Sequence, residues 1–266
     1  MLLAITSETL ESHLSGKGGK AMTLEEAPRF AAERLGVHGM VLDSKYLAGW
    51  PLERLDTLRN CADQAQCPCL ILRESRAVVT TGDAASQAAA MQRVELVTRA
   101  AQRLGCSAVS FRVDGVKGSE QLEHAAKFLR RTMERVERID VNLLLEHGTG
   151  DLEKPEALVE MVKRVGGFRV GTMPNFGLEK SGKESAAILR QTAPYAAAVL
   201  ATIPASEQKD AEGEIESALA RVRPCMEALN LVGFHQVLAL DYLGNGEMER
   251  VCEAVKREVE LLDEDA

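Results

Sequence analysis

The chain has 266 residues, of which 45% are hydrophobic and 27% are charged. This composition is that of an average globular protein and excludes a disordered chain, a collagen-like fibre and a small disulfide-stapled domain. The formal net charge is −8, with 32 Lys and Arg against 40 Asp and Glu. A nucleic-acid-binding surface needs a basic stripe, and the sequence has none, so we expect no nucleic-acid partner.

The six cysteines predict packing rather than metal binding. Several fall in periodic apolar segments, where a free cysteine behaves as a small hydrophobe. Cys67 and Cys69 flank Pro68, a spacing that differs from the Cys-x-x-Cys pair of a zinc site. The apolar start at residues 1–5 is too short for a signal peptide or a membrane span, so we expect a cytoplasmic protein without a membrane partner.

Short apolar runs alternate with amphipathic segments of helical period along the whole chain. The runs are Leu2–Ile5, Gly39–Leu42, Cys69–Leu72, Ala108–Phe111, Val141–Leu145, Phe168–Met173, Ala196–Ile203 and Gln236–Leu240. Gly36 and Gly105 follow the last apolar positions of two helical segments, and Pro155 suits a first helical turn.

Strict strand–helix alternation predicts parallel strands with right-handed crossovers. Eight such units with no spare segment favour an α/β fold, a single (β/α)₈ TIM barrel, over an open sheet. We expect one domain over residues 1–266, closed by pairing of Leu2–Ile5 with Gln236–Leu240.

In such a barrel the functional residues lie where the strands end. Side-chain alternation places Glu146 on the face of Leu144, and Asp241 on the face of Ala239. Asn175 lies beyond the run at 168–173, and alternation points it inward as well. We therefore expect Glu146, Asn175 and Asp241 to converge over the mouth of the barrel.

Two carboxylates in such a place can flank a substrate carbon and exchange a proton with it, or share a divalent cation. Acids at strand ends can equally cap the next helix, and the spacing alone leaves both interpretations open. Arg112 can orient a carboxylate or neutralise an enolate, or it can pair with an acid such as Asp43, itself at a strand end. His147 is either a ligand contact or a loop residue.

The whole chain resembles the xylose isomerase-like TIM barrels, also called the AP-endonuclease family 2 or sugar phosphate isomerase/epimerase group. The segments that carry the resemblance run in family order and are 23–37, 39–43, 101–106, 142–148 and 238–244. The resemblance implies a divalent metal held by a Glu, an Asp, a His and a Glu after strands five to eight, with the two Glu residues as acid and base.

Matched residue by residue, the resemblance implies that Glu146, Asn175 and Asp241 stand at three metal positions. A one-residue gap leaves Leu145 as the alternative to Glu146. The strand-seven position falls near residues 200–201, where there is no histidine. The expected cofactor is therefore a weakly held Mn²⁺ or Mg²⁺, or none.

The first functional hypothesis is an isomerase or epimerase of a sugar, polyol or hydroxy-ketone. Glu146 and Asp241 would be catalytic, and Arg112, Asp43 and His147 would bind substrate. The alternative is a non-catalytic barrel that binds a small polar ligand, and an abasic-site endonuclease is the third hypothesis. The sequence leaves open whether the chain forms a homo-oligomer.

Overall fold

The structure, a computed structural model, describes residues 1–17, 21–205, 210–244 and 247–264. Its strands are β1 Leu2–Thr6, β2 Met40–Asp43, β3 Cys69–Arg73, β4 Val78–Val79, β5 Ala108–Asp114, β6 Asn142–Glu146, β7 Val170–Thr172, β8 Ala198–Ile203 and β9 Val237–Tyr242. The helices are α1 Glu11–Leu14, α2 Ala27–Phe30, α3 Leu52–Gln64, α4 Ala84–Leu104, α5 Gly118–Val136, α6 Pro155–Val165, α7 Gly182–Thr192, α8 Ala211–Leu231 and α9 Met248–Glu264. Short helical turns connect them: η1 Ala31–Leu35, η2 Ser44–Leu47, η3 Asp151–Glu153 and η4 Ala193–Tyr195.

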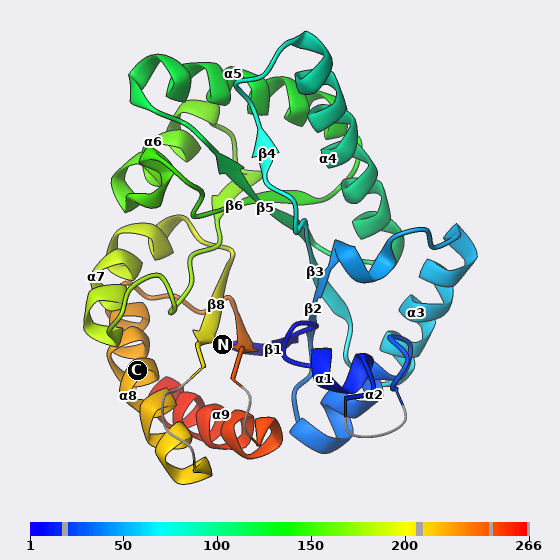
Figure 1. The fold of residues 1–266 in the computed structure, drawn as a ribbon, viewed down its shortest axis with the longest axis vertical. Helices are drawn as coiled ribbons and strands as arrows, with labels where there is room; N and C mark the ends of the chain where they lie inside the picture. The colour runs from blue at the N-terminus through cyan, green and yellow to red at the C-terminus, as the bar shows by residue number, and fades with distance from the viewer. Residues whose placement is uncertain (18–20, 206–209, 245–246, 265–266) are drawn as a thin grey trace.

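The strands form one curled parallel sheet in the order β7-β6-β5-β3-β2-β1-β9-β8. Strands β1 and β9 pair from Leu2 with Val237 to Ile5 with Leu240, which confirms the predicted pairing of the first and last runs. The ring closes between β7 and β8 through bridges at Thr172 with Ala196 and at Asn175 with Leu200. The larger helices surround the strands as an outer layer, as Figure 1 shows. The fold is therefore the predicted TIM barrel.

Two details of the strands differ from the prediction. The short strand β4 pairs with β5 and lies outside the ring. The run at 168–173 yields only the three residues of β7, and Phe168 is fully exposed. Gly166 and Gly167, both at positive φ, lie just before this phenylalanine, and Phe168 and Arg169 form a turn, so the strand starts later than its apolar run.

Local signals in the sequence place the helix ends. Gly36 and Gly105 adopt the left-handed conformation that ends η1 and α4, with φ of 59° and 82°. Pro155 is the first residue of α6, where no N–H is needed. None of the described helices is long and apolar enough to cross a membrane.

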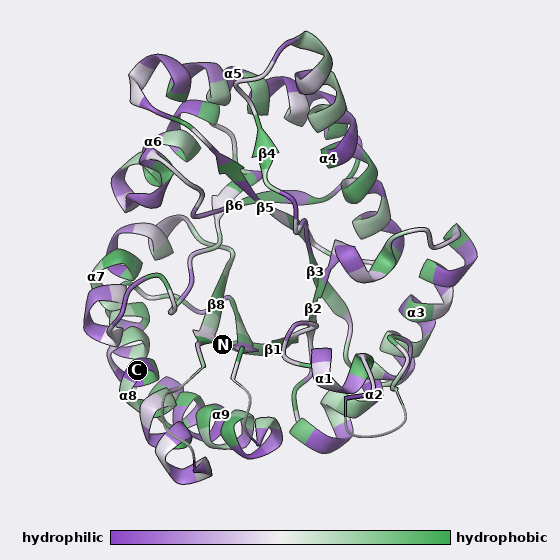
Figure 2. Cartoon of the chain, in the orientation of Figure 1, coloured by the Kyte–Doolittle hydropathy of each residue, from purple (hydrophilic) through white to green (hydrophobic). Residues whose placement is uncertain are grey.

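The core has two layers, because the strands present one face to the helices and the other to the barrel axis. The larger cluster packs the helices onto the sheet. In Figure 2 the helices of the outer layer carry both hydrophobic and hydrophilic residues. The smaller cluster fills the barrel interior and consists of Ala4, Val41, Ile71, Ala108, Leu144, Met173, Ala198, Leu200 and Ala239. These side chains fill the interior of the barrel, as in other barrels of this size. We call this cluster the floor of the barrel.

Candidate active site

A layer of polar side chains lies directly above this floor at the carboxyl ends of the strands. Each member stands two residues after an interior residue, so alternation gives it the same face. We call this set the polar layer: Thr6, Asp43, Arg73, Ser110, Glu146, Asn175, Thr202 and Asp241. It contains the three carboxylates that the sequence indicated, together with an arginine to which the sequence analysis assigned no role.

Arg73 and Glu146 form a bidentate ion pair within the polar layer. The Nε and Nη2 groups of Arg73 donate to Oε1 and Oε2 of Glu146 at 2.8 and 2.7 Å. Ser110 Oγ donates to Oε1 of the same carboxylate at 2.8 Å, and Glu146 is only 4% exposed. This fork geometry fixes the orientation of both side chains.

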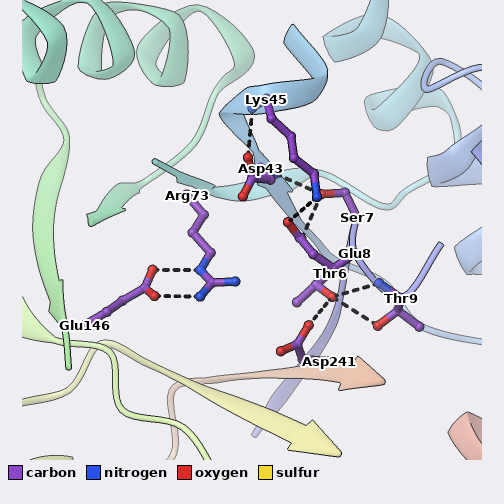
Figure 3. Close-up of polar contacts among 9 residues, drawn as sticks. All are labelled: Thr6, Ser7, Glu8, Thr9, Asp43, Lys45, Arg73, Glu146 and Asp241. Atoms are coloured by element: carbon purple, nitrogen blue, oxygen red, sulfur yellow. Dashed lines mark hydrogen bonds and ion pairs between the residues drawn. The ribbon is translucent and has the colours of Figure 1, made fainter. Parts of the chain in front are cut away.

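Arg73 carries a positive charge that attracts several nearby carboxylates. Burial alone lowers the pKa of Arg73, but the attraction and hydrogen bonds of Glu146 raise it overall, with further attraction from Asp241 and Glu8. In Figure 3 Arg73 lies between Glu146 on one side and the group of Glu8, Thr6 and Asp241 on the other. The guanidinium therefore carries a permanent charge in the middle of the mouth.

Asp241 is held by two hydroxyl groups from the neighbouring strands. Thr6 Oγ1 donates to Oδ1 and Thr202 Oγ1 donates to Oδ2, each at 2.8 Å. Asp241 is 3% exposed. Its buried charge is thus satisfied by neutral donors, in contrast to that of Glu146.

A second acidic group lies next to Arg73 at the end of β1. Burial raises the pKa of Glu8 to about 7, and Asp43 adds to this effect, while Arg73 and Lys45 oppose it. Asp43 is itself 4% exposed, and its carboxylate accepts from the Lys45 backbone N–H at 2.8 Å. Lys45 Nζ lies 3.5 Å from Glu8 Oε1. Asp43 therefore both begins the turn after β2 and faces a carboxyl group whose raised pKa lets it hold a proton up to about pH 7.

The other two predicted substrate contacts, Arg112 and His147, differ in their exposure to solvent. Arg112 is exposed and level with Glu146 on the adjacent strand, and it makes no hydrogen bond or ion pair with any described residue. His147 is buried, and its Nδ1 bonds the Glu153 carbonyl at 3.2 Å. Burial lowers the pKa of His147, so the ring is neutral and its Nε2, which has no partner among the described residues, is an acceptor.

The donor set does not fit a divalent cation well. Both oxygens of Glu146 and of Asp241 already accept hydrogen bonds, and Asn175 Oδ1 accepts from the Gly177 N–H at 2.8 Å. Arg73 places a positive charge against Glu146, where a cation would have to bind. Across the described residues, no group of three or more His, Cys, Asp or Glu side chains is arranged to hold a metal.

An open cavity adjoins this region on the side of β1 and β9. It has a volume of about 510 Å³, and its lining includes Glu8, Thr9, Lys17, Tyr242 and Met248. Glu8 therefore belongs both to the surroundings of Arg73 and to the wall of this cavity. The cavity offers a small molecule room beside the mouth.

Comparison with known proteins identifies the fold class. No protein-family model and no curated protein sequence matches the chain. Among solved structures, L-ribulose 3-epimerase aligns with a TM-score of 0.75 at 12% identity, over 100% of this chain and 97% of that one. The xylose isomerase domain protein from Planctomyces limnophilus aligns with a TM-score of 0.67 at 12% identity, over 100% and 96%.

A third solved structure is the IolI protein with a bound zinc atom, with a TM-score of 0.71 at 14% identity, over 100% of this chain and 99% of that one. At such identities the likeness concerns the fold. The chain has the xylose isomerase-like barrel fold, and the resemblance expected from the sequence is confirmed at that level. Its neighbours include sugar epimerases and a zinc-binding protein.

Arg73 and Glu8 are among the residues that the sequence places at strand ends, but sequence reasoning assigned neither of them a role in this site. A signal for Arg73 was present, because it stands two residues after the apolar Ile71 and so shares its inward face. Glu8 lies beyond the end of β1, where alternation no longer applies, and no comparable signal marks it.

Proposed function

We propose that the mouth of this barrel catalyses isomerisation or epimerisation of a sugar, polyol or related hydroxy-ketone by proton transfer beside a carbonyl group. One observation carries the proposal: two buried carboxylates, Glu146 and Asp241, stand at the ends of different strands of one barrel mouth. The similarity of the fold to L-ribulose 3-epimerase supports the same class of reaction. The substrate is a small molecule.

In this mechanism one group, as a carboxylate, removes the proton from the carbon next to the carbonyl, and the other, as a protonated carboxylic acid, gives a proton to the resulting enediolate. The C–H electron pair becomes part of a C=C bond, and the carbonyl π pair moves onto oxygen. Burial of both carboxyl groups keeps bulk water away from the enediolate during the transfer, and exchange of their protons with solvent between turnovers restores both starting forms. Arg112, Asp43 and His147 are proposed to contact the substrate around this centre.

No step of the mechanism uses a divalent metal, because each oxygen of Glu146 and Asp241 already accepts a hydrogen bond and the Arg73 guanidinium lies against Glu146, where a cation would bind. The reaction consumes no oxidant and no reductant, so it needs no redox cofactor. We place the protein in a reducing cytoplasm, with which its six free cysteines agree.

Deuterium exchange tests the proposal most directly. The protein is incubated in D₂O with a panel of ketohexoses, pentuloses and small hydroxy-ketones, and ¹H NMR follows loss of the signal from the carbon beside the carbonyl. We expect exchange with at least one member, and a loss of about 100-fold or more in Glu146→Gln and in Asp241→Asn. Glu53→Gln, on the exposed surface of α3, is the matched control and should leave exchange unchanged.

The same structure also supports a second candidate function, a binding barrel without catalysis. The observation in its favour is that each oxygen of Glu146 and Asp241 already accepts a hydrogen bond from another side chain, which holds both carboxylates in place. In that case members of the panel would bind, with affinity altered in both variants, and no deuterium would enter any of them. Cleavage of an abasic DNA duplex at physiological salt would instead support the endonuclease hypothesis.

A further inference from the structure

The guanidinium of Arg73 has N–H groups that the protein does not use. An arginine carries five N–H donors, and the bidentate contact with Glu146 uses one on Nε and one on Nη2. Arg73 makes no other hydrogen bond to a described residue, so both N–H groups of Nη1 and one of Nη2 are free. The side chain is 21% exposed, which leaves these donors within reach of a ligand.

The free donors point to the open side of the site. Figure 3 shows the third nitrogen of Arg73 directed away from Glu146, toward the space between Glu8 and Asp241. A ligand oxygen placed there would lie on the side of the guanidinium that faces Asp241, opposite Glu146. Preorganised donors aimed at a position where negative charge develops are an effective form of catalysis.

The guanidinium of Arg73 occupies the position in which a bound metal cation would neutralise the surrounding carboxylates. Glu146, Asp241 and Glu8 all act on it electrostatically, and a divalent cation bound to Glu146 would have to displace its N–H groups. Hard cations sit about 2.0–2.6 Å from carboxylate oxygens, a position that the guanidinium already holds by its hydrogen bonds. A guanidinium and a bound metal therefore exclude each other at this carboxylate.

We propose that Arg73 is the electrophilic catalytic residue of this site, binding the carbonyl oxygen of the substrate and stabilising the enediolate in the role that a divalent metal would otherwise have. This inference rests on the proposed function for its chemistry. Arg73 itself is neither protonated nor deprotonated in the reaction: its N–H groups only strengthen their hydrogen bonds as charge moves from the C–H bond onto the oxygen.

The first experiment measures ligand binding without any reaction. The probes are Mn²⁺ alone and, in the presence of EDTA, glycolohydroxamate, whose planar pair of oxygens resembles an enediolate. By calorimetry we expect wild type to bind the hydroxamate without metal, and Arg73→Met to bind it at least about 10-fold more weakly, a difference typical of losing charged hydrogen bonds. Arg73→Lys keeps the charge but replaces the planar guanidinium fork with a single ammonium group, and its affinity should fall between the two.

Two results of this experiment would overturn the inference. One is stoichiometric Mn²⁺ binding by wild type with a Kd below about 100 μM, which a site closed by Arg73 does not allow. The other is hydroxamate binding that requires Mn²⁺ or is equal in wild type and Arg73→Met. Ser110→Ala removes a hydrogen bond of Glu146 but keeps Arg73, and it controls for disturbance of that carboxylate.

The second experiment separates the inference from the proposed function. Where deuterium exchange is found, EDTA should leave it unchanged, and Arg73→Met should reduce it by about 100-fold or more, the usual effect of removing an oxyanion donor. Exchange that survives Arg73→Met overturns the role of Arg73 while the isomerase function stands. Hydroxamate binding that depends on Arg73, without exchange on any substrate, supports the role of Arg73 as a ligand site and counts against the isomerase.

Discussion

Arg73 on β3 and Glu146 on β6 meet through two hydrogen bonds although β5 lies between their strands. The contact crosses the polar layer instead of following neighbouring strands. It links β3 to β6 at the mouth of the barrel. The positive charge of Arg73 also offsets the free-energy cost of burying the Glu146 carboxylate.

We predict that Arg73→Met destabilises the protein by about 2–4 kcal/mol, because it leaves the buried Glu146 carboxylate without its charged partner. The double variant Arg73→Met, Glu146→Leu should regain most of this loss, since no buried charge remains. Urea denaturation of wild type, both single variants and the double variant provides the measurement. Equal instability of Arg73→Met and the double variant would show that the loss comes from packing of the arginine stem.

The raised pKa of Glu8 predicts a specific pH dependence of stability. The folded carboxyl has a pKa of about 7, against 4.5 for the unconstrained group, so between these values the folded state holds a proton that the unfolded state has released. The contribution of Glu8 is therefore present at low pH and is lost as pH rises through 7, by up to about 3 kcal/mol.

Glu8→Gln removes this titration, because an amide stays neutral. The unfolding free energy of Glu8→Gln relative to wild type should thus increase between pH 5 and pH 8. Glu11→Gln, at an exposed position of the same segment, is the control and should keep the pH profile of wild type. Parallel profiles for Glu8→Gln and wild type would contradict the prediction.

The cysteines should differ sharply in reactivity. Cys61 is half-buried, whereas the other five are buried, and burial raises the pKa of Cys67, Cys69, Cys225 and Cys252 to about 12. Thiolates are the reactive form, so we expect one fast-reacting thiol in the folded protein and all six after unfolding. A disulfide-exchange reagent followed by absorbance measures this, and Cys61→Ser should abolish the fast phase. Rapid labelling of Cys67 or Cys69 would contradict the packing that both the sequence and the structure indicate.

Much of the fold was readable from the sequence because its signals are local. The eight apolar runs and the glycines after helices depend on period and backbone conformation, and Gly36 and Gly105 adopt the left-handed conformation expected of them. The inward direction of Glu146 and Asp241 followed from alternation, since Leu144 and Ala239 lie in the barrel interior. The catalytic and substrate-binding roles of these residues, and a single domain over residues 1–266, stay predictions.

The pairing of Arg73 with Glu146 was not readable, because it depends on the stagger between strands. Arg73 is in register with Ser110, and Ser110 with Leu144, so Glu146 stands two residues further along its strand than the position level with Arg73. A long arginine side chain spans this offset. No pattern within β3 or β6 contains the offset, which is set by how the whole sheet closes.

The separation between the polar layer and the apolar floor has a consequence for redesign. Each polar side chain stands two residues above an interior one, and the interior residues already pack with one another. Positions such as Asn175 and Thr202 can therefore be varied together in a combinatorial library while the floor and the helix-facing core keep their sequence. The packing of the floor would then be kept while new chemistry is selected in the layer above it, which makes this barrel a practical starting point for new sites.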